Sequence, residues 1–307
     1  MPANGIYPAF KLKRYNIHMV ISGREIADSI LLSCRNRIKA LAQRGITPAL
    51  SVIFLGDDPA SRSYISQKQK SAAEIGAQVT LRNLPPDTDR KTFGSIITAL
   101  NSDRTVHGII IQRPLPPEAS EVRPLLNAVV PGKDVDGFVP ESGFEPPVAL
   151  AVGEILKDIQ TSKFKLQSSN EDKLFPWLRT LNIVILGRGE TAGEPIADYF
   201  RKNNCATSIV HSRTPHPEKN IRSADIVISC VGRERVITDT NIKTGVILIS
   251  VGIRRDNSGK LRGDYDEAEI QDSAAFYTPT PGGVGPVNVA CLMRNLVRAS
   301  EKPLQVS

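Results

Sequence analysis

The sequence is short of cysteine, aromatic residues and long apolar runs. Its four cysteines form no C-x-x-C pair and have no histidine at ligand spacing, which argues against a metal site and a disulfide framework. They are predicted to be small buried side chains in a reducing compartment, the cytoplasm: Cys34, Cys205, Cys230 and Cys291. No stretch approaches the ~18 consecutive apolar residues of a membrane-spanning helix, so no membrane association is expected.

Charge narrows the range of partners. The net charge is +7, but residues 1–18 contribute three cations and no acid, which leaves +4 for the rest of the chain. The remaining cations form no basic stripe interleaved with aromatic residues, so nucleic-acid binding is a weak alternative. A modest cationic excess suits a protein that binds phosphorylated or carboxylated small molecules. Residues 1–18 have no apolar core of a secretory signal and are predicted to be a disordered tail or a mis-called start.

The most informative stretch is a glycine turn in the second half of the chain. The apolar, β-branched run 183–186 predicts a buried parallel strand, and a helical pattern resumes at about Ala192. Between them Gly187, Gly189 and Gly193 give the spacing G-x-G-x-x-x-G, one residue longer than the Rossmann fingerprint. Such a turn lets a diphosphate approach the helix N-terminus, although a plain strand-to-helix turn is the competing interpretation.

The next predicted strand, 206–210, points to the type of nucleotide. NAD sites usually place an acidic residue after this strand, whereas this chain has Ser212 and Arg213, with Arg188 in the glycine turn. A hydroxyl and cations suit a 2′-phosphate, so the pattern favours NADP over NAD, the alternative being solvated surface arginines. Two more apolar strands closed by glycine complete a doubly wound sheet: 224–232 and 245–252.

The first half also alternates strands and helices, so the 307 residues are predicted to form two α/β domains, each with a mostly parallel sheet. The predicted helices are 26–41, 60–75 (capped by Gly76), 91–100 and, near the end of the chain, 287–300. The predicted strands are 49–55, 78–84 and 108–112. A polar stretch at 161–177 marks the domain junction, and the Gly/Pro-rich loop 280–286 is expected to be neither helix nor strand.

Several side chains of the first half could carry chemistry. Tyr64 and Lys68 share one helix face, and Gln112 ends a buried strand, where open α/β sheets place ligands. Asp134 and Asp136 lie in a polar turn without helical or strand periodicity, and the glycines of 282–285 offer backbone donors. Each feature also has a structural explanation, as a solvated helix face, a turn cap or a plain turn, so a site is indicated by their concurrence.

Four motifs in register make the chain similar to a known family. The segments Asp57–Lys68, Gly108–Pro116, Lys133–Phe138 and Thr278–Pro286 resemble the bifunctional methylenetetrahydrofolate dehydrogenase/methenyltetrahydrofolate cyclohydrolase family, and the resemblance runs from about Met19 to the C-terminus. It implies a folate-binding catalytic domain and a Rossmann-like NADP-binding domain. Their expected bounds are 19–157 plus 283–307 for the first and 158–282 for the second.

The resemblance also implies roles for individual residues. Lys68 is the expected catalytic residue, Gln112 bonds to it and tunes it, and Tyr64 packs against the pterin and p-aminobenzoyl groups. Asp136 is expected to bind the pterin amino and ring N–H groups. The loop with Pro281, Gly282 and Gly283 is expected to close the folate site beside the nicotinamide. The expected cofactor-binding residues are Gly187, Arg188, Gly189, Gly193, Ser212, Arg213, Val231, Gly232, Gly252 and Ile253.

The implied activities are oxidation of 5,10-methylenetetrahydrofolate with NADP, NAD being possible, and hydrolysis of the methenyl product to 10-formyltetrahydrofolate. The implied assembly is a homodimer formed through the nucleotide domain. Alternatives are another NADP-dependent oxidoreductase of the same plan, a member without the dehydrogenase step, and a non-catalytic nucleotide-binding protein.

The chain departs from the family pattern in three places. Segment 145–153 lacks the usual Pro-Cys-Thr-Pro, Gly189 and Ala192 replace Ser and Val, and Ser250 replaces Asp. The last two changes lie in the nucleotide domain and bear on NADP affinity.

Overall fold

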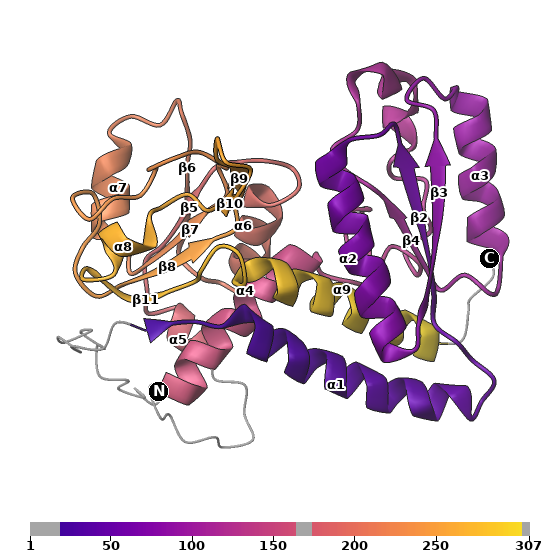
Figure 1. Ribbon diagram of the computed structural model, residues 1–307, viewed down its shortest axis with the longest axis horizontal. Coiled ribbons are helices and arrows are strands. Elements are labelled where there is room, and N and C mark those ends of the chain that lie inside the picture. The colour runs from indigo at the N-terminus through magenta and orange to yellow at the C-terminus, as the bar shows by residue number, and fades with distance from the viewer. Residues whose placement is uncertain (1–18, 164–173, 303–307) are drawn as a thin grey trace, which may run out of the picture. The chain divides into compact units, whose positions relative to one another are not determined.

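The computed structural model describes residues 19–163 and 174–302, so the expectation for residues 1–18 lies outside the described residues. The described chain forms two compact units (Figure 1). Unit 1 contains residues 19–23 and 152–285, and unit 2 contains residues 24–151 and 286–302. Each unit has its own parallel sheet, which confirms the predicted α/β class.

Unit 2 is built on a three-stranded sheet with the strand order β3-β2-β4. The strands are β2 (Ala49–Leu55), β3 (Gln78–Leu84) and β4 (Gly108–Ile111). The helices α2 (Pro59–Ile75) and α3 (Arg90–Ser102) connect them. Because β3 and β4 lie on opposite sides of β2, right-handed crossovers place α2 and α3 on opposite faces of the sheet (Figure 1).

Helix α2 begins and ends where its sequence predicts. The Asp58 carboxylate accepts a hydrogen bond from the Ser61 amide at 2.7 Å, and Pro59 occupies the first turn, where a missing N–H does no harm. Gly76 ends the helix with a φ of 87°, a left-handed conformation that glycine adopts without strain. Ile65, Lys68 and Ala72 recur at helical spacing and lie on the buried side of α2.

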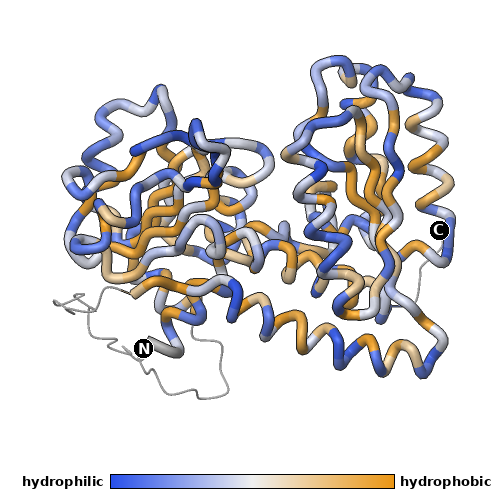
Figure 2. The backbone as a smooth tube through the Cα atoms, in the orientation of Figure 1, coloured by the Kyte–Doolittle hydropathy of each residue, from blue (hydrophilic) through white to orange (hydrophobic). Residues whose placement is uncertain are grey.

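The other elements of unit 2 complete its core. They are η1 (Pro117–Leu125), most of α1 (Gly23–Ala42) and of α9 (Val284–Glu301), and residues 147–151 of α4 (Pro147–Asp158), the rest of which belongs to unit 1. One face of the sheet packs Ile53, Ile109 and Ile111 against Phe93 and Ile97 of α3. Figure 2 shows apolar residues concentrated on β2 and β4, whereas β3 also carries polar residues.

The predicted extent of the loop 280–286 is wrong at its C-terminal end. Helix α9 begins at Val284, so Gly285 and Pro286 lie in its first turn. The first four N–H groups of a helix have no intrahelical partner, and a proline there loses nothing. Val284 and Val287 are buried, and this burial outweighs the poor helix propensity of the glycine and proline between them.

Unit 1 has a six-stranded parallel sheet in the order β1-β11-β8-β7-β5-β6. Its strands are β1 (Met19–Val20), β5 (Ile183–Leu186), β6 (Thr207–Val210), β7 (Ile226–Ser229), β8 (Val246–Ser250) and β11 (Ala274–Tyr277). Its remaining elements are the π-helical turn η2 (Ile159–Lys163), α5 (Leu174–Leu178), α6 (Gly193–Lys202), α7 (Pro217–Ser223), α8 (Glu267–Ile270) and the hairpin β9 (Arg254–Arg255) and β10 (Leu261–Arg262).

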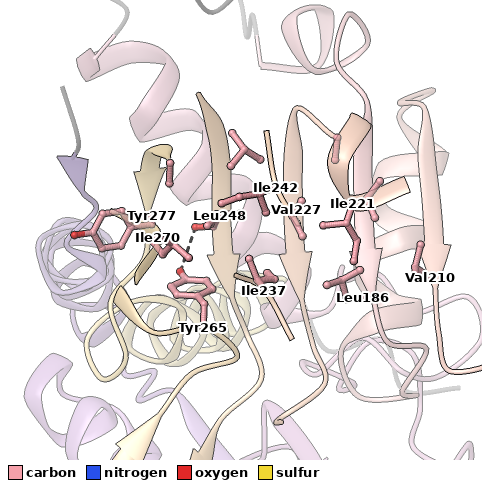
Figure 3. Packing of buried hydrophobic residues seen from close by; sticks show 14 residues of the cluster. Leu186, Val210, Ile221, Val227, Ile237, Ile242, Leu248, Tyr265, Ile270 and Tyr277 are labelled. Atoms are coloured by element: carbon pink, nitrogen blue, oxygen red, sulfur yellow. Dashed lines mark hydrogen bonds between the residues drawn. The ribbon is translucent and has the colours of Figure 1, made fainter. Parts of the chain in front are cut away.

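The core of unit 1 lies on this sheet. Figure 3 shows Leu186, Val227 and Leu248 from three neighbouring strands pointing into one apolar cluster with Ile237 and Tyr265. All four residues of β5, β7 and β11 and all five of β8 are buried, as expected for strands covered on both faces.

The strand order also locates the ligand-binding edge of unit 1. The chain runs from β5 outward to β6, then returns to β7 on the other side of β5. In open α/β sheets such a reversal marks the usual nucleotide position, beyond the carboxyl ends of the two strands, here β5 and β7. The loops that begin at Gly187 and Cys230 emerge there.

Two smaller expectations need correction. The polar stretch 161–177 extends too far, because residues 174–178 form helix α5 with Leu174, Trp177 and Leu178 buried; residues 164–173 lie outside the described residues. The four cysteines are all free, but Cys230 is only half-buried, since it follows β7 at the sheet edge. In the described ranges no helix is long and apolar enough to cross a membrane.

Candidate active site

A buried lysine is the centre of the candidate site in unit 2. Lys68 is 4% exposed and Gln112 is 7% exposed, and the Lys68 ammonium donates a hydrogen bond to Gln112 Oε1 at 3.0 Å. The Gln112 amide nitrogen donates to the Arg113 carbonyl at 2.7 Å, which orients the amide with its oxygen toward Lys68. Two elements supply the pair, since Lys68 lies on α2 and Gln112 directly follows β4.

Tyr64 lies one helical turn before Lys68 and belongs to the same candidate site. The Lys68 ammonium nitrogen is 5.2 Å from the centre of the Tyr64 ring, within cation–π range. The Tyr64 hydroxyl accepts a hydrogen bond from the side-chain amide of Asn288, which lies on α9. Desolvation of the phenol, and to a lesser degree the negative charge of Asp136, raise the pKa of Tyr64 above its usual range, so the hydroxyl stays protonated.

Asp136 is placed in the site by a short extension of the sheet. Asp134 forms an isolated parallel bridge with Ile109 of β4, so Asp136 lies two residues further toward the carboxyl end of that strand. The Asp134 carboxylate accepts hydrogen bonds from the Gly137 amide at 3.1 Å and the Val139 amide at 2.8 Å. Asp134 therefore caps the turn, whereas Asp136 carries the charge that interacts with Lys68.

The charges in the site shift one another's pKa values. Burial lowers the pKa of Lys68 below that of a free lysine, and the carboxylate of Asp136 opposes this shift only in part. Burial raises the pKa of Asp136, and the cations of Lys68 and Arg113 oppose that shift. The Arg113 guanidinium lies 4.6 Å from the ring centre of Phe138, beside the same turn.

This arrangement suits proton transfer to and from a bound molecule. A lysine with a lowered pKa exchanges protons near neutral pH, and a neutral amide orients it without adding a charge. Asp136 and the Tyr64 ring offer a hydrogen-bond acceptor and a flat apolar surface to a heteroaromatic ligand. The structure therefore brings together Tyr64, Lys68, Gln112 and Asp136 as the sequence predicted.

The glycine turn of unit 1 has the geometry of a phosphate-binding loop. Gly187 has a φ of 98°, and a Cβ on Gly193 would lie 2.1 Å from the Gly187 carbonyl oxygen, so only glycine lets α6 begin this close to β5. A Cβ on Gly189 would meet nothing within 4 Å, so the backbone is uncovered there. Ala192, at the start of α6, provides no side-chain cap. These features fit a diphosphate at the helix N-terminus.

The other predicted cofactor residues follow the carboxyl ends of neighbouring strands. Ser212 and Arg213 are exposed after β6, and Arg188 is exposed in the glycine turn. Val231 and Gly232 follow β7, and Gly252 and Ile253 follow β8, with Ile253 56% exposed. A cationic and hydroxyl set at this edge fits a nucleotide that carries a 2′-phosphate.

A buried carboxylate that the sequence did not single out shapes this edge. Asp264 is fully buried and accepts hydrogen bonds from the Ser229 hydroxyl at 2.6 Å, the Val231 amide at 3.1 Å and the Arg233 amide at 2.8 Å. A Cβ on Gly252 would lie 2.3 Å from its carboxylate oxygen. Asp264 follows the short hairpin after β8, and nothing local in the sequence marks it as a partner of β7.

Ser250, at one of the departures from the family pattern, helps to hold the same region. Its hydroxyl accepts a hydrogen bond from the Asp264 amide at 3.1 Å and donates to the Gly252 carbonyl at 3.2 Å. A serine at this position therefore has a structural use in this chain.

The predicted loop residues Pro281, Gly282 and Gly283 belong to unit 1, whereas Tyr64, Lys68, Gln112 and Asp136 belong to unit 2. Gly282 has a φ of 105°, and a Cβ on Gly283 would lie 2.6 Å from the Pro279 carbonyl oxygen, so the loop folds back closely on its own segment. Within the described residues no group of three His, Cys, Asp or Glu side chains could hold a metal ion.

Comparison with known proteins agrees with both units. Residues 21–136 match the family described as the tetrahydrofolate dehydrogenase/cyclohydrolase catalytic domain, and residues 174–304 match its NAD(P)-binding domain. The chain is 35% identical over 291 residues to the bifunctional protein FolD of Staphylococcus epidermidis, covering 92% of this chain and 96% of that protein.

Solved structures give the same result. The bifunctional enzyme FolD from Campylobacter jejuni superposes with a TM-score of 0.81 at 30% identity, covering 92% of this chain and 98% of that one. The Trypanosoma brucei methylenetetrahydrofolate dehydrogenase-cyclohydrolase, solved with NADP and an inhibitor, has a TM-score of 0.80 at 30% identity, covering 92% and 97%. The chain therefore belongs to the tetrahydrofolate dehydrogenase/cyclohydrolase family.

Proposed function

We propose that this protein oxidises 5,10-methylenetetrahydrofolate to 5,10-methenyltetrahydrofolate with NADP and then hydrolyses the product to 10-formyltetrahydrofolate. The observation that carries the proposal is the buried Lys68, bonded to the neutral Gln112 and interacting with the charge of Asp136, in a chain that matches both domains of the family. Unit 2 is proposed to bind the folate and unit 1 the nucleotide.

In the proposed folate complex, Asp136 accepts hydrogen bonds from the pterin amino and ring N–H groups. A half-buried carboxylate makes strong charge-assisted bonds, because little water competes for it. The Tyr64 ring packs against the pterin and p-aminobenzoyl groups, and the loop with Pro281, Gly282 and Gly283 closes the site. These contacts leave the one-carbon bridge of the substrate next to Lys68.

The oxidation step requires mainly orientation. NADP supplies the acceptor for the hydride that leaves the methylene bridge. The turn with Gly187, Gly189 and Gly193 is proposed to hold its diphosphate. Arg188, Ser212 and Arg213 are proposed to bind its 2′-phosphate, and Val231, Gly232, Gly252 and Ile253 to line the rest of the nucleotide. Proximity of this kind can account for much of the rate enhancement of such a transfer.

The hydrolysis step requires proton transfers. Water adds to the methenyl carbon and the neutral amine of Lys68 takes the proton that the water loses. The bond between the one-carbon unit and N5 then breaks while N5 gains a proton from the Lys68 ammonium, and the hydroxyl proton of the adduct is released as the formyl C=O forms. Gln112 keeps the amine directed at the reacting carbon, and the burial that lowers the pKa of Lys68 favours its neutral form relative to a free lysine.

The assembly and the cellular compartment belong to the same proposal. A homodimer formed through unit 1 is expected and is tested by light scattering, and the cytoplasm is the proposed compartment.

A direct assay tests the function. The purified protein is incubated with methylenetetrahydrofolate and either NADP or NAD while the methenyl absorbance is followed. The expected record is a rise and decay with NADP and a weaker rise with NAD. No rise with either nucleotide, together with decay of added methenyltetrahydrofolate, would instead identify the alternative, a member that has lost the dehydrogenase step.

A further inference from the structure

Helix α9 presents two asparagines to the proposed folate site. Asn288 and Asn295 are seven residues apart, about two helical turns, so they lie on the same side of α9. Most of their neighbours on this helix are buried apolar residues, among them Val289, Leu292 and Leu296. Polar side chains in such surroundings need a reason, and both bond to the segments that carry Tyr64 and Asp136.

The first contact is made by Asn288. Its side-chain amide donates a hydrogen bond to the oxygen of the Tyr64 hydroxyl, 224 residues away in sequence. In this bond the phenol oxygen is the acceptor, so the hydroxyl hydrogen remains available as a donor. Asn288 is half-buried, so the bond is partly shielded from water.

The second contact is made by Asn295, which is fully buried. Its side-chain nitrogen donates to the Val135 carbonyl at 3.0 Å and to the Glu145 carbonyl at 3.1 Å. Val135 directly precedes Asp136. The side-chain oxygen of Asn295 has no hydrogen-bond partner among the described residues, so only its two donor bonds account for an asparagine at this position.

The turn that Asn295 holds is closely packed on two other sides. A Cβ on Gly108 would lie 2.9 Å from a methyl group of Val135, and a Cβ on Gly137 would lie 2.7 Å from the Phe144 carbonyl oxygen. The Asp136 backbone therefore has little room to move while the bonds from Asn295 persist.

We propose that Asn288 and Asn295 are positioning residues for the folate, Asn288 through the hydroxyl of Tyr64 and Asn295 through the backbone that carries Asp136. The proposal rests on the proposed function, because it assumes that Tyr64 and Asp136 bind the pterin. In it, α9 sets the spacing of the two folate-binding side chains.

Double-mutant cycles test the two contacts separately, with the KM for methylenetetrahydrofolate as the measured quantity. Asn288→Leu removes one hydrogen bond and Asn295→Ala removes two, and each is expected to raise this KM by about tenfold with the Kd for NADP unchanged. In a Tyr64→Phe background Asn288→Leu is expected to have no further effect, and in an Asp136→Ala background Asn295→Ala should add no more than about twofold.

Ser300→Ala is the matched control, because Ser300 is buried on the same helix and its hydroxyl donates to the Leu296 carbonyl of α9 itself. Asn295→Ser, which keeps one hydroxyl donor, replaces Asn295→Ala if the alanine variant does not fold, and the same direction is expected. The positioning role would be overturned if the two single-mutant increases in KM multiplied in the double mutants. It would also be overturned if the affinity for NADP fell as much as that for the folate. A wild-type protein without activity on methylenetetrahydrofolate would overturn the function instead.

Discussion

The Lys68 ammonium nitrogen lies 3.0 Å from Gln112 Oε1, and both side chains are buried. A lysine buried beside a neutral acceptor loses part of its preference for the charged form, and the carboxylate of Asp136 restores only part of it. This balance makes Lys68 suitable as a proton carrier in the site.

Replacing the amine should separate the two activities. Lys68→Met is expected to lower the rate of methenyltetrahydrofolate hydrolysis at least about 100-fold, because no other group takes over the proton transfers. Hydride transfer to NADP should fall much less, since it depends on orientation. Lys70→Met is the control, because Lys70 is an exposed lysine on the same helix. Near-normal hydrolysis by folded Lys68→Met protein would disprove the role of Lys68.

Two different substitutions of Gln112, the hydrogen-bond partner of Lys68, should shift the pH profile of hydrolysis in opposite directions. Gln112→Glu places a carboxylate against Lys68, which raises the pKa of the amine, so the rise in rate should shift to higher pH. Gln112→Leu removes an acceptor that favours the ammonium, so the rise should shift to lower pH. The measurement is kcat as a function of pH for the two variants, and a shift in the same direction in both would contradict this role for Gln112.

Removing the carboxylate should affect the folate and spare the nucleotide. Asp136→Ala is expected to weaken folate binding by about 10- to 100-fold, the range for charge-assisted hydrogen bonds, with NADP binding unchanged. Calorimetric titration of each ligand separately measures both effects. Asp87→Ala, at an exposed position of the same unit, is the control. Equal weakening of both ligands would argue against a pterin contact.

Removing the exposed arginines should change nucleotide preference. The double variant Arg188→Ala/Arg213→Ala is expected to weaken NADP binding by about tenfold or more and to leave NAD binding nearly unaffected, because only NADP carries the 2′-phosphate. Kd values for both nucleotides measure the effect, and Arg104→Ala in unit 2 is the control. A parallel loss of NAD affinity would place these arginines elsewhere on the nucleotide.

His107 should make the protein less stable in mild acid. It is buried, and its Nδ1 accepts a hydrogen bond from the Ala49 amide at 3.2 Å, which requires the neutral ring. Burial, and then the charge of Lys133, lower the pKa of His107 below 6.5. As the pH falls from 6.5 toward the folded-state pKa, the unfolded chain takes up a proton that the folded chain does not, so the free energy of unfolding decreases.

The expected decrease is at most about 1.4 kcal/mol per pH unit within that window, and above pH 6.5 the contribution is complete. Urea unfolding at pH 7.5 and pH 5 measures it in the wild type and in His107→Gln, which should lose less stability between the two values. His216→Gln, at an exposed position, should behave like the wild type. If the stability of His107→Gln depended on pH as that of the wild type does, His107 would not be the cause of the loss of stability in acid.

The sequence by itself determined the local structure and most of the candidate site. Apolar runs such as Ile183–Leu186 are strands because both faces are covered, and Asp58 and Gly76 delimit α2 by caps that act within a few residues. The resemblance of four motifs to a known family, and not a local pattern, predicted Tyr64, Lys68, Gln112 and Asp136 as one set. The strands and caps could be predicted because they depend on backbone sterics and on hydrogen bonds between near neighbours, which one sequence displays directly.

Only the tertiary structure decided how those residues are held. Asn295 bonds to Val135 across 160 residues, and Asp264 bonds to Ser229 across 35, so neither partnership has a local signature. The start of α9 at Val284 follows from burial of its first turn, which outweighs a glycine and a proline. The lowered pKa of Lys68 has the same origin, because desolvation depends on everything that packs around a group and not on the residues beside it in the chain.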